Sequence, residues 1–166
     1  MDAVQPQRAI TLRFLAEPSE VNFGGKVHGG TVMKWIDQAG YAGAVGWSGQ
    51  YCVTIYVGGI RFYQPILIGD LVEVQAKLIY TGTTSMHFAV DVWAGDPKLP
   101  TQSAKRRKTT HCIIIFVAID GEGKPSPVPA WQAQTEEDRK LEAYARQLMD
   151  LRKGIEEEMS RFQSAD

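Results

Sequence analysis

Hydrophobic and polar residues alternate along two stretches in the middle of the chain, and a third stretch is apolar throughout its second half. Alternation with a period of two is typical of a β-strand that has one face in a core. In DLVEVQAKLIY (residues 70–80) it separates an apolar face from a polar one: Val72, Val74, Ala76 and Leu78 against Glu73, Gln75 and Lys77. SMHFAVDVWAG (residues 85–95) alternates in the same way, with an apolar face of Met86, Phe88, Val90 and Val92. TTHCIIIFVAID (residues 109–120) predicts a central strand that is covered on both sides.

Two more strands are predicted nearer the N-terminus. AITLRFLAE alternates weakly and indicates a strand over residues 9–16, which Pro18 ends. YCVTIYVGGIRFYQPI (residues 51–66) is rich in β-branched and aromatic residues. Its adjacent glycines, Gly58 and Gly59, indicate a bulge or a close backbone approach.

Two segments have helical spacing instead. Residues 31–47 form the first, and the second begins near Thr135, where TEED resembles a capping box. Apolar residues recur along the second helix at Leu141, Ala145, Leu148, Ile155, Met159 and Phe162. The order is therefore strand, helix, four strands and helix. Short connections between the late strands favour an antiparallel meander, and a sheet that curls around the first helix gives both a single core.

Composition and charge limit the function classes. A chain of 166 residues suits one domain, and a net charge of −1 gives no overall sign of a nucleic-acid or membrane partner. Cys52 and Cys112 lie in apolar runs without metal-ligand spacing, as expected of buried thiols in a reducing compartment. The N-terminus lacks a signal-peptide pattern, and the longest apolar run is too short to span a bilayer, so we expect a cytoplasmic protein.

Residues 22–47 contain seven glycines, in two groups with different expected roles. Gly40, Gly43 and Gly46 lie within the helix, where each glycine costs about 1 kcal/mol relative to alanine. We therefore expect a strand or a second helix to approach there. The other four (Gly24, Gly25, Gly29 and Gly30) precede the first helical turn, whose N–H groups have no partner within the helix. They form either a tight turn or a site that stabilises negative charge on a carbonyl oxygen.

Asp37 follows Gly30 by two helical turns, so the two share a face with Met33, Gly40 and Ala44. A carboxylate on an apolar face is costly unless it is hydrogen-bonded, so Asp37 has either a structural or a functional role. Two turns span about 10 Å, whereas a general base acts within about 3 Å of the proton it takes. If both features serve one reaction, Asp37 must therefore come from a second copy whose helix runs antiparallel, in a symmetric homodimer.

These residues, NFGGKVHGGTVMKWID, resemble the hotdog-fold acyl-CoA thioesterases of the cytosolic acyl-CoA hydrolase branch. The resemblance rests on an asparagine before the glycines, a glycine pair at the helix start and M-x-W-x-D within the helix. It continues through VTIYVGGIRFYQPILIGDLVEV, TGTTSM and the closing VAIDGEGKPSPVP, roughly residues 10–130. It implies an α+β hotdog fold, a curved antiparallel sheet wrapped around one long central helix, plus a C-terminal helix. Residues 1–132 would form the thioesterase domain and residues 133–166 a helical extension.

The resemblance also implies a hydrolase of acyl-CoA thioesters in lipid metabolism. Asp37 would act as general base or nucleophile. The backbone N–H of Gly29, with Gly30, would polarise the thioester carbonyl from the partner subunit. Asn22 would hydrogen-bond the water or the carbonyl, although a loop asparagine is also common in turns. Thr54 would orient Asp37 or the water.

Binding of coenzyme A would involve further residues. Gly82, Thr84 and Ser85 match the family's stretch near the pantetheine, and Arg61, Arg106 and Arg107 are candidates for the phosphates. A basic run such as KRRK (residues 105–108) is also common in solvated loops. By resemblance we expect a hexamer built as a trimer of dimers. We expect no metal and no cofactor beyond the coenzyme A of the substrate.

Two alternative functions are weighed against hydrolysis. A hotdog enoyl-thioester hydratase would use a histidine in a His-Phe-Pro-Gly-like motif, and KVHGG lacks the Phe-Pro. A non-catalytic acyl-CoA-binding hotdog module would have no need of Asp37. Neither His28, His87 nor His111 is expected to act as a base, and no G-x-S-x-G elbow is present.

Overall fold

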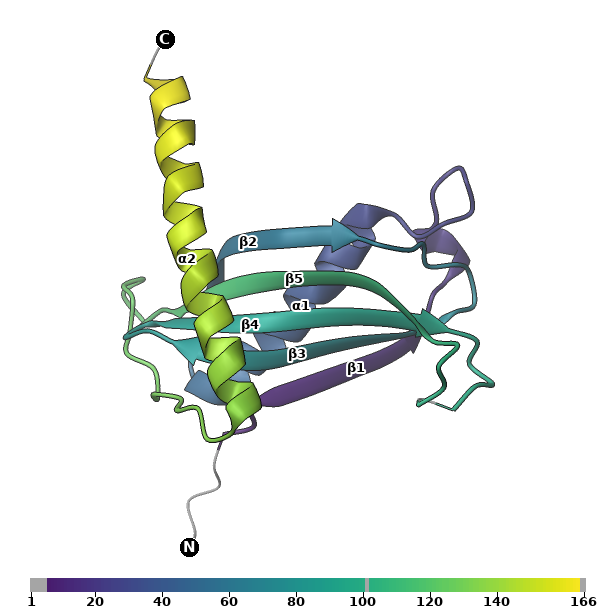
Figure 1. Ribbon diagram of the computed structural model, residues 1–166, viewed down its shortest axis with the longest axis horizontal. Coiled ribbons are helices and arrows are strands. Elements are labelled where there is room, and N and C mark those ends of the chain that lie inside the picture. The colour runs from purple at the N-terminus through teal and green to yellow at the C-terminus, as the bar shows by residue number, and fades with distance from the viewer. Residues whose placement is uncertain (1–5, 101, 165–166) are drawn as a thin grey trace, which may run out of the picture.

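The computed structural model describes residues 6–100 and 102–164, and it places one antiparallel sheet between two helices (Figure 1). The predicted order of strand, helix, four strands and helix is confirmed. The elements are β1 (Ala9–Leu15), the single-turn 3-10 helix η1 (Pro18–Glu20), α1 (Gly29–Ser48), β2 (Cys52–Phe62), β3 (Leu71–Thr81), β4 (Ser85–Gly95), β5 (Arg107–Ala118) and α2 (Glu136–Gln163).

The sheet has the strand order β1-β3-β4-β5-β2. The predicted meander of β3, β4 and β5 is confirmed, and β1 and β2 lie at the two edges. The predicted bulge in β2 is also confirmed, since the register with β5 shifts between Gly58 and Arg61. Gly59 has φ of 62°, in the left-handed region that favours glycine.

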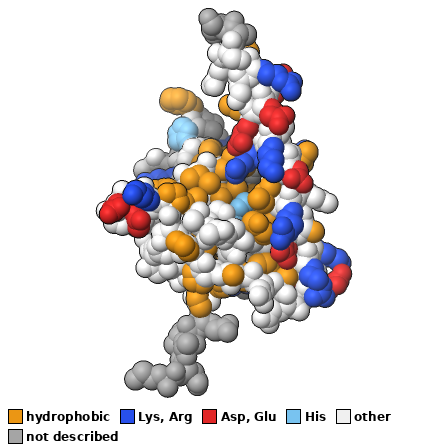
Figure 2. Space-filling model, turned by 90° about the vertical axis from the view of Figure 1, so that its left-hand side faces the viewer, with side chains coloured by type: hydrophobic (Ala, Val, Ile, Leu, Met, Phe, Trp, Pro, Cys, Tyr) orange, Lys and Arg blue, Asp and Glu red, His pale blue; other side chains and the backbone are white. Residues whose placement is uncertain are grey.

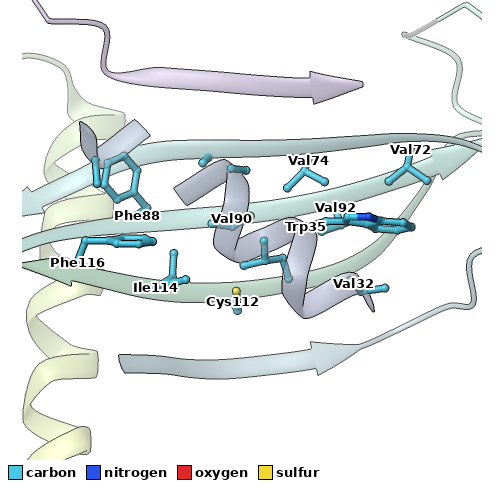
Figure 3. Close-up of a cluster of buried hydrophobic side chains, with 14 of the residues drawn as sticks. Val32, Trp35, Val72, Val74, Phe88, Val90, Val92, Cys112, Ile114 and Phe116 are labelled. Carbon is cyan, nitrogen blue, oxygen red and sulfur yellow. The ribbon is translucent and has the colours of Figure 1, made fainter. Parts of the chain in front are cut away.

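The main core lies between α1 and the inner face of the sheet (Figure 3). The helix contributes Val32, Trp35 and Ile36. The predicted apolar faces of β3 and β4 are fully buried against it: Val72, Val74, Ala76, Leu78, Met86, Phe88, Val90 and Val92. The curved antiparallel sheet around a central helix is thus the predicted hotdog architecture.

Two of the three helix glycines lie where the sheet comes close to α1. A Cβ atom on Gly40 would lie 2.7 Å from the Phe116 ring, and one on Gly43 would lie 2.8 Å from the Phe88 ring. The predicted close approach of strands is therefore confirmed at these positions. Gly46 differs, because a Cβ there would meet nothing within 4 Å. The sheet does not explain that glycine.

Helix α2 crosses the outer face of the sheet (Figure 1), so β5 is covered on both sides as predicted. A second apolar cluster joins Ile113 and Ile115 of β5 to Ala145 of α2. The capping box is confirmed, because the Thr135 hydroxyl accepts a hydrogen bond from the Asp138 N–H at 3.1 Å.

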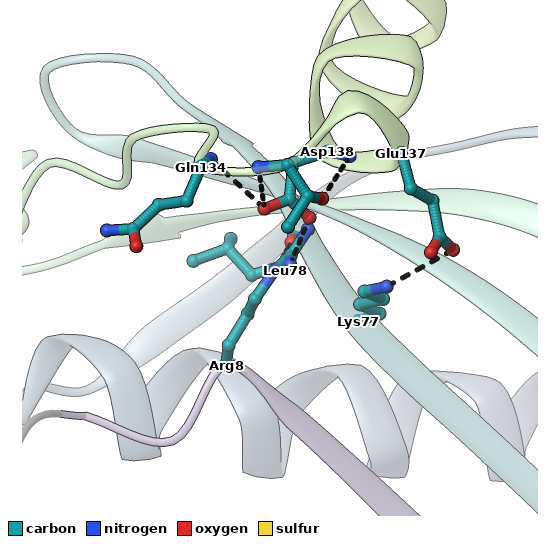
Figure 4. A network of polar contacts seen from close by, with 7 residues as sticks. Arg8, Lys77, Leu78, Gln134, Glu137 and Asp138 are labelled. Atoms are coloured by element: carbon teal, nitrogen blue, oxygen red, sulfur yellow. Dashed lines mark hydrogen bonds and ion pairs between the residues drawn. The ribbon is translucent and has the colours of Figure 1, made fainter.

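The first turn of α2 is also held to the sheet by a polar network (Figure 4). Arg8 pairs with Asp138 and donates through Nε to the Leu78 carbonyl at 2.8 Å. Lys77 pairs with Glu137 at 3.6 Å. The start of α2 is therefore packed onto the same sheet as the rest of the chain, and the division at residues 132 and 133 stays a prediction.

Candidate active site

Asp37 and Thr54 meet at the surface between α1 and β2. The Thr54 hydroxyl donates a hydrogen bond of 2.5 Å to the Asp37 carboxylate. These residues come from a helix and a strand 17 positions apart, and only the packing of α1 on the sheet brings them together. One carboxylate oxygen is thereby held in place, and the other is available for chemistry.

The expected surroundings of Asp37 are partly wrong. Gly40 and Ala44 are buried against the sheet, whereas Asp37 is exposed. The reason is that α1 buries the face that contains Ile36 and Gly40, and Asp37 lies at the edge of that face.

The exposed surface around Asp37 is nevertheless apolar. Met33 and Tyr41, one turn before and after it, are 42% and 38% exposed, and Ile55 beside Thr54 is 50% exposed. Large apolar side chains that surround an exposed carboxylate are typical of a surface covered by another molecule.

The N-terminal end of α1 is open to solvent. His28 is the N-cap residue and makes no side-chain capping bond, and the Val32 N–H makes the first helical hydrogen bond to the His28 carbonyl, at 3.1 Å. Within the described part of the chain, the N–H groups of Gly29 and Gly30 have no hydrogen-bond partner. A Cβ atom on Gly30 would meet nothing within 4 Å, so an acceptor can approach these amides closely.

Asn22 organises the loop before this helix. Its side-chain oxygen accepts hydrogen bonds from the N–H groups of Gly24 at 2.9 Å and Lys26 at 3.2 Å. Gly25 has φ of 75° and makes the turn. Gly24 and Gly25 therefore serve the turn, whereas Gly29 and Gly30, expected just before the helix, are the first two residues of α1.

A groove of about 300 Å³ opens beside this helix end. Asn22 and Gly29 line it, together with Phe62 at the end of β2 and the segment 63–66 that follows. No role was predicted for Tyr63 and Gln64 in this segment. The adjacent aromatic pair Phe62 and Tyr63 shortly before Pro65 is the signal that could have found it, and each of the two is 50% exposed. Asp37 is not part of the groove.

The predicted residues therefore fall into two groups at opposite ends of the sheet. Arg61 pairs with His111 in the register of β2 and β5, near the groove, and its guanidinium lies 5.4 Å from the centre of the Tyr63 ring. At the other end, Phe116 pairs with Thr54 on one side and Val117 with Ser85 on the other. The turn that contains Gly82, Thr84 and Ser85 thus lies at the Thr54 end.

Two of the predicted phosphate contacts have carboxylate partners within the chain. Arg106 is buried, with 8% exposure, and pairs with Glu73 at 2.7 Å. Arg107 pairs with Asp70 at 2.5 Å. Arg106 is therefore buried with its carboxylate partner, as expected of a buried charge. The Arg107 side chain is 29% exposed, and its contact with a phosphate stays a prediction.

A cluster that the sequence did not predict lies under α2. His111 contacts Asp91 at 2.7 Å through Nδ1 and the Tyr144 hydroxyl at 3.0 Å through Nε2. A signal for it was present in the sequence, because Asp91 and His111 occupy polar positions of two strands, β4 and β5, that pair directly in the structure. The cluster ties α2 to the sheet and is on the face opposite Asp37.

The cysteines are unsuited to nucleophilic chemistry. Both thiols are free and buried, as predicted. Burial, with the nearby Asp91 charge, raises the pKa of Cys112 to about 12, and burial also raises the pKa of Cys52. A thiol with a raised pKa carries little thiolate at neutral pH.

The described residues contain no cluster of three or more side chains suited to holding a metal ion. None of their helices combines the length and the apolar character that crossing a membrane requires.

Comparison of the chain with known proteins identifies its family. Residues 24–101 match the thioesterase superfamily model. The acyl-CoA thioester hydrolase YciA of Salmonella typhimurium is 35% identical over 125 residues, which cover 75% of this chain and 92% of the relative. The chain belongs to the hotdog-fold acyl-CoA thioesterases.

Solved structures of this family share the fold. A hexameric acyl-CoA thioesterase superposes with a TM-score of 0.81 at 29% identity, covering 90% of this chain and 94% of that one. An acyl-CoA hydrolase from Staphylococcus aureus, solved with butyryl coenzyme A and coenzyme A, has a TM-score of 0.79 at 26% identity, with 93% and 89% covered. Variants of the Staphylococcus aureus hydrolase with alanine in place of one aspartate, one asparagine or one threonine have also been solved.

Proposed function

We propose that this thioesterase hydrolyses acyl-CoA to a free acid and coenzyme A at a site shared by two copies of the chain. Asp37 of one copy would activate water, and the amides of Gly29 and Gly30 of the other would polarise the thioester carbonyl. The observation that carries the proposal is the Thr54–Asp37 hydrogen bond on an exposed, apolar surface of α1.

The distance between the two groups requires the second copy. Asp37 and Gly30 lie on one straight helix, about 10 Å apart along its axis. A base and an oxyanion site must both lie within about 3 Å of the same reacting group. Two α1 helices that run antiparallel place the Asp37 end of each beside the glycine end of the other. The exposed side chains of Met33 and Tyr41 would then be covered.

The chemistry at this site is addition of water followed by loss of thiolate. Asp37 takes a proton as the water oxygen bonds to the carbonyl carbon, and the negative charge that forms on the carbonyl oxygen is stabilised by the two N–H groups. Breakage of the carbon–sulfur bond then releases the acid and the thiolate of coenzyme A, which takes up the proton that Asp37 holds. Direct attack by the carboxylate, with hydrolysis of the resulting anhydride, uses the same residues.

Asn22 and Thr54 support these two groups. The Asn22 side-chain oxygen is occupied by the loop amides, so its NH2 group is left to donate to the water or the carbonyl. Thr54 keeps the Asp37 carboxylate in one orientation. The three residues mutated in the Staphylococcus aureus hydrolase follow one another at the same intervals as Asn22, Asp37 and Thr54, which supports a common role.

Coenzyme A would lie across the two copies. Arg61, exposed near the groove, and the partly exposed Arg107 are the remaining basic candidates for the phosphates. The turn of Gly82, Thr84 and Ser85 would line the path of the pantetheine, as the resemblance implies. No resident cofactor is needed in this scheme, because coenzyme A arrives with the substrate. A trimer of such dimers would give the hexameric state of the relative described above.

Replacement of Asp37 by alanine tests the proposed base. The Asp37→Ala variant should release coenzyme A from acyl-CoA at least a hundredfold more slowly, because a general base contributes about 10²–10⁴ in rate. Thiol release measured by a colour reaction gives the rate, and size-exclusion chromatography checks that the assembly is intact. Full turnover by this variant would show that Asp37 is not the base.

A mixture of variants tests the shared site. Each mixed dimer of Asp37→Ala and Asn22→Ala chains contains one site with both native residues. An equal mixture after subunit exchange should recover about a quarter of the wild-type rate, because half of the dimers are mixed and each has one native site. No recovery, with exchange shown by tagged subunits, would mean that each site is built within one chain.

A further inference from the structure

The second half of α2 extends beyond the edge strand β2 (Figure 1). It carries an exposed apolar stripe. Leu151, Ile155, Met159 and Phe162 are 64%, 54%, 58% and 79% exposed. Their spacing of three and four residues puts them on one helix face. Basic and acidic side chains are spaced along the face of this helix that Figure 2 shows.

The stripe begins where contact with the sheet ends. Ala145 is fully packed on β5, and the Arg152 guanidinium lies 4.9 Å from the centre of the Tyr56 ring of β2. Every described residue of α2 after Arg152 is exposed. A helical half without packing gains little stability from its own hydrogen bonds, so another element should cover it.

The direction of the stripe shows where that element lies. Leu151 and Ile155 line a hollow of about 150 Å³ together with Gly58 and Gly59 of β2 and Ile113 of β5. They therefore face sideways over β2, along the surface of the sheet. The element that covers the stripe should therefore lie beside α2 on that surface of the sheet.

The apolar stripe is self-complementary: two copies of the helix that run antiparallel and cross at Ile155 bring apolar side chains opposite one another. Reversal places Leu151 opposite Met159 and Leu148 opposite Phe162, each pair apolar. It also places the Arg152 of one helix within one turn of Glu156 of the other. Arg152 and Glu156 already pair within one chain at 3.0 Å, so the two helices would offer alternating charges beside the stripe.

We propose that the partner is the α2 helix of a second copy, packed antiparallel about a twofold axis at Ile155. This inference rests on the dimer of the proposed function. Both α1 and α2 run along the sheet (Figure 1), so one twofold axis perpendicular to the sheet beside β2 makes each helix antiparallel to its copy. Ile155 comes about 4.5 Å along the helix after Arg152 and lines the hollow beside Gly58 and Gly59, which places it at the β2 edge of the sheet. The α2 pair would hold together the two chains that form each active site.

Cysteine cross-linking tests the pairing and its register. In a Leu151→Cys/Met159→Cys double variant, each cysteine faces the other cysteine of the second copy. Mild oxidation should convert most of this variant to a covalent dimer on a non-reducing gel. The two cysteines are about 12 Å apart within one helix, which is too far for a disulfide in one chain.

The matched controls are the two single variants and the wild type. A single cysteine at 151 or 159 faces a native side chain in the antiparallel register and should stay monomeric on the gel, as should the wild type, whose Cys52 and Cys112 are buried. Cross-linking of Leu151→Cys alone would indicate parallel helices and overturn the proposal. Failure of the double variant to cross-link faster than the single ones would also overturn it.

A further variant separates this inference from the proposed mechanism. Adding Asp37→Ala to the double-cysteine chain should leave cross-linking unchanged while it removes turnover. Cross-linking with full turnover would overturn the role of Asp37 and leave the helix pair standing. Loss of turnover without cross-linking would overturn the helix pair alone.

Discussion

Asp37 and Thr54 form a contact that depends on one hydroxyl group. The hydroxyl donates to a carboxylate, and such charge-assisted hydrogen bonds are stronger than those between neutral groups. Both side chains are exposed in the single chain, so the contact contributes more to orientation than to folding. The helix glycines also differ in their surroundings, since Gly40 faces an aromatic ring and Gly46 faces open space.

Removal of the Thr54 hydroxyl should therefore affect turnover more than stability. We expect Thr54→Val to lower kcat for acyl-CoA about tenfold, equivalent to ~1.4 kcal/mol, because the Asp37 carboxylate is no longer held in one orientation. Thr54→Ser keeps the hydroxyl and should keep most of the activity. Equal rates for the valine and serine variants would remove Thr54 from the mechanism.

The two glycines should respond in opposite ways to a methyl group. Gly40→Ala should lower the free energy of unfolding by about 1–3 kcal/mol, because the buried Phe116 ring cannot move away from the new Cβ. Gly46→Ala should raise it by up to about 1 kcal/mol, because alanine favours the helix. Urea unfolding measures both. A stabilised Gly40→Ala protein would show that the ring has room to shift.

Helix α2 turns the outer face of the sheet into a second buried layer. It covers Ile113 and Ile115, contacts His111 through Tyr144, and encloses His87, which is 3% exposed. Burial and the nearby Arg152 charge lower the pKa of His87 to about 4. This histidine is therefore neutral in the folded chain at pH values where it is charged in the unfolded one.

The buried His87 should make stability depend on pH in a defined range. Its folded pKa of about 4 lies below the ordinary value of 6.5, so the unfolded chain binds more protons between these values. The contribution of the neutral His87 to the free energy of unfolding should be fully present above pH 6.5. The free energy of unfolding should fall by up to about 3 kcal/mol as the pH drops to 4.

Unfolding in urea at several pH values tests this expectation. The matched control is His87→Gln, which cannot take up a proton and should show a flatter profile between pH 4 and 6.5. Carboxylates with lowered pKa values, such as Asp91 and Asp138, lose their contribution mainly below that range. Identical profiles for both proteins would contradict the assignment to His87.

Two of the apolar surfaces that the described residues leave uncovered lie on opposite sides of the sheet. The first surrounds Asp37 on α1, and the second runs along the end of α2. An axis beside β2 would cover both at once. Assembly and activity should therefore be linked, because each active site needs residues from two chains.

Dilution should separate the chains and remove activity together. We expect specific activity to fall at the concentration where analytical ultracentrifugation shows dissociation of the dimer, since a lone chain has Asp37 but no facing amides. The double-cysteine variant, once cross-linked, should resist this loss. Constant specific activity of a wild-type protein shown to be monomeric would refute the shared site.

The helices, the strands and their buried faces could be predicted from the sequence, whereas the candidate active site could be predicted only in part. The alternation in β3 and β4 predicted their core faces, and the TEED motif predicted the start of α2, because such signals are local. The positions of Asp37 and the glycine pair on one helix also required only helix geometry. The charge pairs could not be predicted from the sequence. Asp91 meets His111 only because β4 pairs with β5, and Arg106 meets Glu73 only through the arrangement of the whole sheet.

The sequence alone determined that Asp37 and the bare amides are two turns apart on one helix, because the rise of an α-helix is constant. Only the tertiary structure decided which side of that helix faces solvent, because this depends on which of its faces the sheet covers. It also decided that Thr54 reaches Asp37 and that Arg106 is withdrawn into the interior. Local geometry thus located the chemistry along the chain, and the packing of distant segments determined which of those groups are exposed at the surface.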